Sequence, residues 1–194
     1  MMLRNTAREI AVHLAYELSF TALPVEELLE TRLNAERFAE LAGEDALYQE
    51  APDQLQRDYI ARLVTGVSEH AAELDGYIAK YARGWKFSRI PLVASAIMRV
   101  AMYEILYMPE IPNGAAINEA VEIAKHYETP EMVKFINGIL GSFARQELPD
   151  ETGTRASRRP AFSLQMRENE GRERHGAQDH QRQRAQRRGE APAG

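Results

Sequence analysis

A run of ten residues in the middle of the chain combines cations and aromatic rings in a pattern that suits nucleic-acid binding. From Lys80 to Arg89 a Lys or Arg stands at every third position, with Tyr81, Trp85 and Phe87 between them. Cations hold phosphates and flat rings stack on bases, so the pattern fits a single-stranded RNA surface. It fits equally well a solvated loop in which Trp85 and Phe87 fill the gap between two helical halves. The sequence leaves both interpretations open.

A second candidate phosphate site lies near the N-terminus. Arg4 and Arg8 are one turn apart at the start of a predicted helix. Two guanidinium groups so placed could clamp adjacent phosphates. Two arginines are also an ordinary surface pair, and their spacing alone does not decide between the two.

A metal site is the weaker hypothesis. Glu119, Glu122 and His126 follow one side of a predicted helix. Di-iron helical bundles instead use Glu-x-x-His on two helices, and no second copy of such a motif is present in this sequence. We expect a solvated face on which Glu122 and His126 form a weak pair, with no metal and no cofactor.

The remaining composition excludes several classes of protein. The chain has no cysteine, which removes disulfide frameworks, thiolate zinc sites and cysteine nucleophiles. It has no Gly-rich phosphate loop and no Gly-x-Ser-x-Gly motif, so we expect no enzyme. The longest apolar run, residues 90–98, is too short for a membrane span. The N-terminus has no secretory segment, and we expect a soluble cytoplasmic protein.

Composition changes abruptly near residue 150. The last 44 residues hold 10 Arg and 6 acidic residues, a net charge of +4, and the first 150 hold 14 cations and 23 acids, a net charge of −9. The tail has too few large apolar residues to form a core, so we expect 149–194 to be a disordered Arg-rich tail. Arg-rich tails can bind RNA with little selectivity or serve as solubilising extensions.

Apolar residues in the first 150 positions recur with helical rather than strand spacing. We therefore predict an all-α fold with about seven helices in two packed subdomains, residues 1–84 and 85–148. Residues 6–9 (Thr-Ala-Arg-Glu) have the form of a capping box, and residues 129–131 (Thr-Pro-Glu) are typical of a helix start. Gly138 and Gly141, three positions apart, indicate a close approach between two helices.

Three linked blocks in the last third of the chain are specific enough to indicate a family. They are RVAMYE at 99–104, AINEAVEIAK at 116–125 and KFINGIL at 134–140, with Ile-Pro at 111–112 between the first two. In this order and with these gaps they resemble the signature of the NusB transcription antitermination family. The N-terminal helix is similar too, and the resemblance covers residues 4–146. It implies an all-helical RNA-binding adaptor with two subdomains.

The family resemblance also implies partners. They are boxA-type single-stranded RNA of ribosomal RNA leaders, the small-subunit ribosomal protein NusE, and the RNA polymerase antitermination complex. Matched position by position, the resemblance assigns RNA binding to Arg4, Arg8, Tyr127, Glu131, Lys134 and Phe135, and NusE binding to Tyr16. Asn5 and Thr6 stand where relatives often have arginines. The alternative is therefore a helical protein-interaction adaptor with weakened RNA binding.

The most recognisable polar residues of the three blocks suit a structural role. Glu104, Asn118, Glu119 and Asn137 belong to helices that we expect to be buried. Buried polar groups need hydrogen-bonding partners, so we predict that these four residues cap or cross-link helices.

Overall fold

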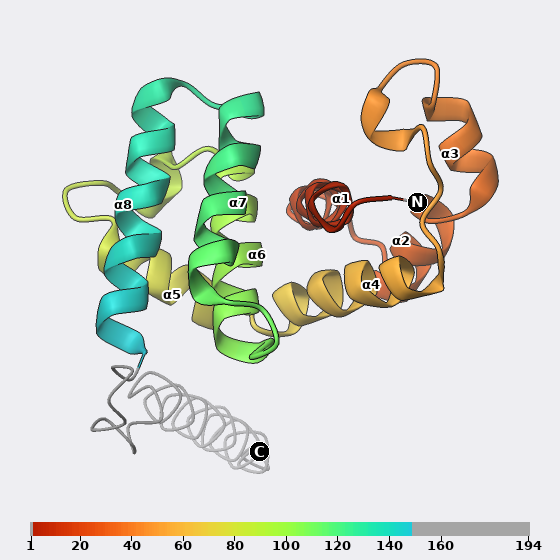
Figure 1. The fold of residues 1–194 in the computed structure, drawn as a ribbon. Coiled ribbons are helices and arrows are strands. Elements are labelled where there is room, and N and C mark those ends of the chain that lie inside the picture. The colour runs from red at the N-terminus through yellow and green to blue at the C-terminus, as the bar shows by residue number, and fades with distance from the viewer. Residues whose placement is uncertain (1, 149–194) are drawn as a thin grey trace, which may run out of the picture. The chain divides into compact units, whose positions relative to one another are not determined.

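Residues 2–148 are described by the structure, a computed structural model, and they form helices and loops without a strand (Figure 1). The α-helices are α1 (Arg4–Glu17), α2 (Val25–Arg32), α3 (Ala35–Leu41), α4 (Gln54–Glu69), α5 (Ala71–Tyr81), α6 (Leu92–Tyr107), α7 (Asn113–Tyr127) and α8 (Pro130–Glu147). Two short 3₁₀ turns, η1 (Ala46–Tyr48) and η2 (Phe87–Arg89), lie in the loops. The all-α prediction is confirmed. The prediction for the Arg-rich tail lies outside the described residues.

Helix α6 is the centre of the core. Eleven of its sixteen residues are buried, and it packs against α1, α4, α5, α7 and α8. A helix that is apolar on nearly every side must be covered on every side, which explains why so many neighbours surround this one. None of the helices within residues 2–148 has the length and apolar character needed to cross a membrane.

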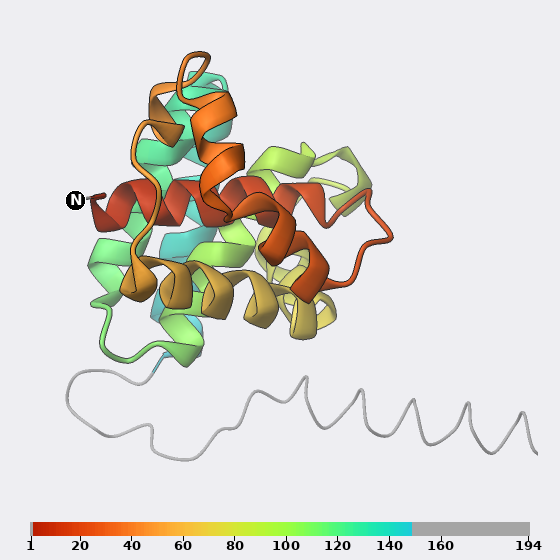
Figure 2. The same ribbon diagram turned by 90° about the vertical axis from the view of Figure 1, so that its right-hand side faces the viewer.

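Helix α1 packs against helices from the middle of the described chain. It packs against α4 and α6, and Figure 2 shows it running across the molecule with α4 beside it. Residues 2–148 belong to one compact unit. The predicted division into residues 1–84 and 85–148 stays a prediction.

Two of the predicted helix starts can be compared with the observed ones. Helix α1 begins at Arg4, ahead of the predicted capping box, and its N-cap Leu3 makes no side-chain hydrogen bond. The capping-box prediction at residues 6–9 was wrong, because Thr6 already lies inside the helix. The start of α8 is confirmed: the Thr129 hydroxyl accepts a hydrogen bond from the Met132 N–H, and proline occupies the first turn.

Residues 25–41, where helical spacing of apolar residues by itself predicts one helix, form the two helices α2 and α3. Asn34 ends the first and caps the second, because its side-chain oxygen accepts a hydrogen bond from the Arg37 N–H at 2.8 Å. A side chain that satisfies a free N–H at a helix start stabilises a break in the chain direction. This break accounts for the eight α-helices of residues 2–148 where about seven were predicted.

The close helix contact lies at a different glycine from the predicted pair. Space is open around Gly138, and Gly141 meets only Arg145 of its own helix, so the predicted approach was wrong. At Gly66 of α4 a Cβ would overlap the ring of Tyr103 of α6. Absence of a side chain at Gly66 therefore sets how closely α4 and α6 pack.

Candidate nucleic-acid interface

Arg8 is a buried residue of α1, with only 3% of its surface exposed. Its Nε donates to both carboxylate oxygens of Glu104 on α6, at 2.9 and 3.1 Å, and its Nη1 lies 3.9 Å from Glu119 of α7. The Tyr59 hydroxyl of α4 donates to the same Glu104 carboxylate. The guanidinium of Arg8 thus joins four helices and is not available to a phosphate. The clamp predicted for Arg4 and Arg8 is not formed.

The electrostatics of this cluster favour the charged pair. Burial alone lowers the pKa of Arg8, but the hydrogen bond and charge of Glu104 oppose it, and the net effect is a raised pKa. Burial raises the pKa of Tyr59, and the negative charge of Glu104 raises it further. Arg8 is therefore charged and Tyr59 is neutral, which lets Tyr59 donate to the carboxylate.

Arg4 lies one turn before Arg8 on the same face of α1, at the start of the helix. Its side chain is exposed, and its guanidinium carbon lies 5.7 Å from the centre of the Tyr59 ring. Contact of a cation with a ring face leaves most of the guanidinium donors free. Of the two predicted arginines, Arg4 is the one that can reach a phosphate.

Tyr127, at the end of α7, is bound to α1. Its hydroxyl lies 2.7 Å from Glu9 Oε1 and 2.7 Å from His13 Nε2. Because the carboxylate of Glu9 can only accept, the Tyr127 hydroxyl donates to Glu9 and accepts from His13 Nε2–H. His13 Nδ1, at 2.9 Å from the Tyr48 hydroxyl, then accepts from Tyr48. One chain of hydrogen bonds thus fixes the position of the Tyr127 ring, which stays partly exposed.

His13 is neutral in this chain of hydrogen bonds. Burial lowers its pKa, and the charges of Glu9 and Asp45 oppose that effect without reversing it. A neutral imidazole matches the donor on one nitrogen and the acceptor on the other that the arrangement requires. Both tyrosine partners of His13 are distant in the sequence, so no local pattern predicts them.

The three residues considered above as metal ligands each have a different partner. Glu119 lies beside Arg8, Glu122 binds Lys125 at 2.5 Å, and His126 Nδ1 lies 2.9 Å from Glu9 Oε1. The predicted pair of Glu122 and His126 was wrong, because α1 brings a carboxylate to His126. Among residues 2–148 no three His, Cys, Asp or Glu side chains are grouped as metal ligands.

The start of α8 carries the other predicted RNA residues. Glu131 and Lys134 are exposed, and Phe135 is partly buried against the core. The ring of Phe135 contacts the ring of Trp85, with centroids 4.9 Å apart. Trp85 is 49% exposed, whereas Phe87 packs partly buried against the core. Of the two rings considered above as fillers of a gap, Phe87 faces inward and Trp85 faces solvent.

Tyr16, predicted to bind the protein partner, lies on the last turn of α1. It is partly buried against the core, and its ring meets that of Phe20 edge-on with centroids 5.0 Å apart. Phe20 is exposed. An exposed ring held against a partly buried one is a suitable anchor for a protein partner.

The four polar signature residues do not share one role. Glu104 and Glu119 cross-link helices through Arg8, as predicted. Asn118 and Asn137 are exposed, so the prediction of a buried structural role was wrong for them. Sequence inspection also missed Glu9, although its four-residue spacing from His13 on α1 was a usable signal.

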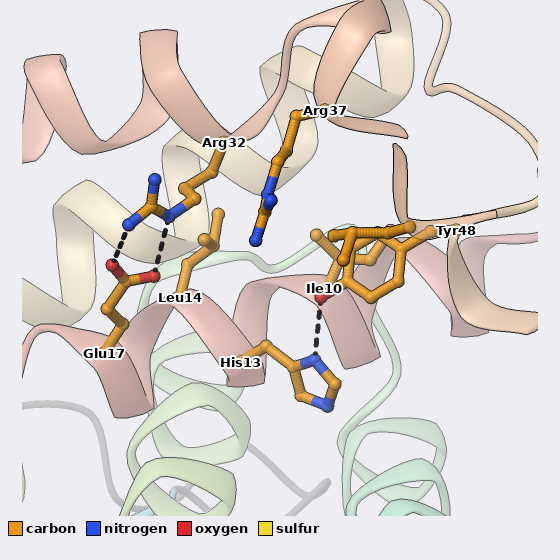
Figure 3. Close-up of a pocket in the computed structure, with 8 residues that line it drawn as sticks. Ile10, His13, Leu14, Glu17, Arg32, Arg37 and Tyr48 are labelled. Carbon is orange, nitrogen blue, oxygen red and sulfur yellow. Dashed lines mark hydrogen bonds and ion pairs between the residues drawn. The ribbon is translucent and has the colours of Figure 1, made fainter. Parts of the chain in front are cut away.

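A small pocket lies between α1, α3 and η1, next to His13 and Tyr48 (Figure 3). Arg37 points into it, and Arg32 closes one side through two hydrogen bonds to Glu17 at 2.6 and 3.1 Å. Its volume is about 100 Å³, well below the several hundred Å³ of typical cofactor sites.

These observations define an all-α protein with a buried ion pair between α1 and α6 and with exposed cations that make no ion pair within residues 2–148 on α1, on α8 and on the loop before α6. The NusB family model matches residues 5–145. The chain belongs to the NusB family.

Individual relatives agree with the family match. The chain is 38% identical over 146 residues to transcription antitermination protein NusB of Thermoanaerobacter sp. (strain X514), covering 75% of this chain and 93% of the relative. A solved structure of T. maritima NusB is 28% identical, with a TM-score of 0.64 and coverage of 76% and 94%. A crystal structure of antitermination factors NusB and NusE in complex with dsRNA is 22% identical and has the same fold, with a TM-score of 0.58 and coverage of 73% and 96%.

Proposed function

We propose that this protein is an RNA-binding transcription antitermination factor of ribosomal RNA operons. It binds boxA-type single-stranded RNA together with NusE and acts in the cytoplasm, within the RNA polymerase antitermination complex. It performs no bond-making chemistry of its own. Membership of the NusB family and the name carried by its relatives support this proposal.

The observation that carries the proposal is the exposed start of α8. Lys134 is exposed and makes no ion pair with another residue of the described chain, and the neighbouring Phe135 keeps part of its ring accessible. A cation beside an accessible ring can hold a phosphate and stack a base. Tyr127, held by Glu9 and His13, brings a third side chain to the same helix junction.

NusE binding is the protein-interaction part of the proposal, and Tyr16 with Phe20 forms its anchor on α1. A protein of this fold has been solved with NusE and RNA. We expect Tyr16→Ala to weaken NusE binding because the edge-on ring contact with Phe20 is lost. The RNA affinity of the free protein should be unchanged.

Fluorescence anisotropy with a labelled boxA-type strand tests the RNA part. The wild-type protein should bind this strand more tightly than a scrambled strand, and added NusE should increase the difference. Lys134→Gln should weaken binding, whereas Arg145→Gln, an exposed cation further along the same helix, should not. Equal affinity for the boxA-type and scrambled strands, with and without NusE, would overturn the proposal.

The second candidate is a helical adaptor with weakened RNA binding. Burial of Arg8 favours it, because Arg4 is then the only one of the two predicted N-terminal arginines left for phosphate. In that case Arg4→Gln and Lys134→Gln leave RNA binding unchanged while Tyr16→Ala abolishes NusE binding.

A further inference from the structure

We propose that the loop between α5 and α6 is a base-stacking platform that extends the RNA surface of α8. The exposed Trp85 ring, braced by Phe135, receives one base, and the cations around it hold the adjoining phosphates. This inference rests on the proposed function, because it names further residues of the same RNA-binding surface. Figure 1 shows the loop, in yellow-green, projecting beside α8.

The ring pair has the form of a braced platform. Phe135 packs on the core and is partly buried, so its position is fixed by α8. The rings of Trp85 and Phe135 are in contact with an interplanar angle of 44°, and 49% of the Trp85 surface is exposed to solvent. A large exposed ring held by a second ring offers a flat face to an incoming base without needing to move.

The loop itself is ordered by its own backbone. Gly84 has a φ of +81°, a conformation that favours glycine, and the Trp85 N–H donates to the Ala82 carbonyl at 3.0 Å. Three residues after Gly84, Phe87 turns inward, and Ile90 is buried. Trp85 is thus held outward between two fixed points, which reduces the entropy lost on binding.

The charges around the ring are free. The exposed side chains of Arg83, Lys86 and Arg89 make no ion pair within residues 2–148, and the same holds for Lys134 on α8. Several other cations of the described chain are paired: Lys80 binds Glu147, and Arg62 binds Glu110. One acidic residue, Glu131, precedes Lys134 by three positions on α8. The loop and the start of α8 therefore form a positive patch, although residues 1–150 as a whole carry a net charge of −9.

Single-stranded RNA suits this patch better than a protein partner does. A protein anchor would need a broader apolar face, whereas here Trp85 is the one large exposed apolar side chain of residues 82–91. One exposed ring with cations close to it in the chain matches one base and its neighbouring phosphates. Protein binding by the loop is an outcome that the experiment can detect.

Trp85 is the only tryptophan of the chain, so the protein carries its own reporter. A boxA-type strand titrated into the full-length protein should quench the tryptophan emission, because a stacked base contacts the indole. The Kd fitted to the quenching curve should equal the Kd fitted to the anisotropy titration. Trp85→Ala should weaken binding about 5- to 100-fold, and Trp85→Phe should keep most of the affinity. Leu55→Ala, which changes a 77% exposed apolar side chain on α4, should leave the affinity unchanged.

The charges give a second measurement. Lys86→Gln should lower the slope of log Kd against log salt concentration by about 0.7. Arg145→Gln should leave the slope as it is. Circular dichroism confirms that each variant is folded before binding is measured.

The outcomes separate the platform from the proposed function. RNA binding by anisotropy with no change in emission, and with wild-type affinity for Trp85→Ala, overturns the platform and leaves the proposed function standing. A Trp85→Ala variant that loses NusE binding and keeps RNA binding shows that the loop docks protein, and this also overturns the platform. Absence of RNA binding by the wild-type protein overturns both.

Discussion

Arg8 and Glu104 are 96 positions apart in the chain and form a fully buried ion pair between α1 and α6, with Nε bound to both carboxylate oxygens. This pair fixes how α1 is turned against α6. With Arg8 facing inward, Arg4 is left in solvent one turn earlier, and Glu9 faces α7. The predicted RNA residue Arg8 thus becomes a residue that positions the others.

Breaking this pair should strongly destabilise the fold. Arg8→Ala leaves the Glu104 carboxylate buried without its cation, and we expect the free energy of unfolding to fall by about 3–5 kcal/mol. The double variant Arg8→Met/Glu104→Gln removes both charges and keeps an acceptor for Tyr59, so it should recover much of that loss. Urea unfolding measures each value. The control Arg4→Ala should change stability by less than about 0.5 kcal/mol; a loss equal to that of Arg8→Ala would contradict this assignment.

A matched pair of glycine substitutions tests the packing of α4 on α6. In Gly66→Ala the new methyl group overlaps the Tyr103 ring, so we expect a loss of about 1–3 kcal/mol from overpacking. In Gly138→Ala the methyl group meets open space in the middle of α8, and stability should rise by about 0.5–1 kcal/mol. The midpoints of urea unfolding give the sign of both changes. Equal effects of the two substitutions would show that α4 and α6 are not closely packed at Gly66.

The hydrogen bonds of His13 predict a pH dependence of stability. Burial lowers the pKa of His13 in the folded protein, so as pH falls through the unfolded value of 6.5 the unfolded chain takes up the proton first. The stabilising contribution of neutral His13 is complete above that pH and is lost below it. Between pH 7 and 5.5 the free energy of unfolding of the wild type should fall more steeply than that of His13→Gln, by at most about 1.4 kcal/mol per pH unit. Parallel pH curves for the two proteins would contradict the prediction.

Arg4 should contribute to RNA binding through charge alone. Removing one phosphate contact from a single strand lowers the slope of log Kd against log salt concentration by about 0.7. We expect this change for Arg4→Gln in anisotropy titrations at several salt concentrations, with the boxA-type and scrambled strands affected alike. An unchanged slope would remove Arg4 from the RNA surface and support the adaptor alternative.

The sequence was sufficient to predict the helical fold class, the helix start that depends on local residues, and the family resemblance. The periodicity of apolar residues is a property of neighbouring positions, so the all-α class followed directly from it, and the start of α8 followed from the Thr-Pro-Glu sequence at residues 129–131. Local signals fail where two interpretations compete over a few residues. The residue types at 6–9 predict a cap by the Thr6 hydroxyl, although α1 begins at Arg4, and Asn34 divides a stretch that helical spacing predicts to be continuous.

The linear order of residues determined that the chain forms helices and which side chains carry charge or rings, because both depend only on residue type and short-range spacing. Tertiary structure alone decided which of these side chains face solvent. Arg4 and Arg8 are alike in type, and so are Trp85 and Phe87 as large aromatic residues, yet in each pair one faces outward and the other faces inward. Arg8 is buried because Glu104 of α6 faces it, and the direction of the loop is set by the core that receives Phe87. Glu104 and the core residues around Phe87 are contributed by other parts of the chain, so no local sequence pattern predicts these contacts.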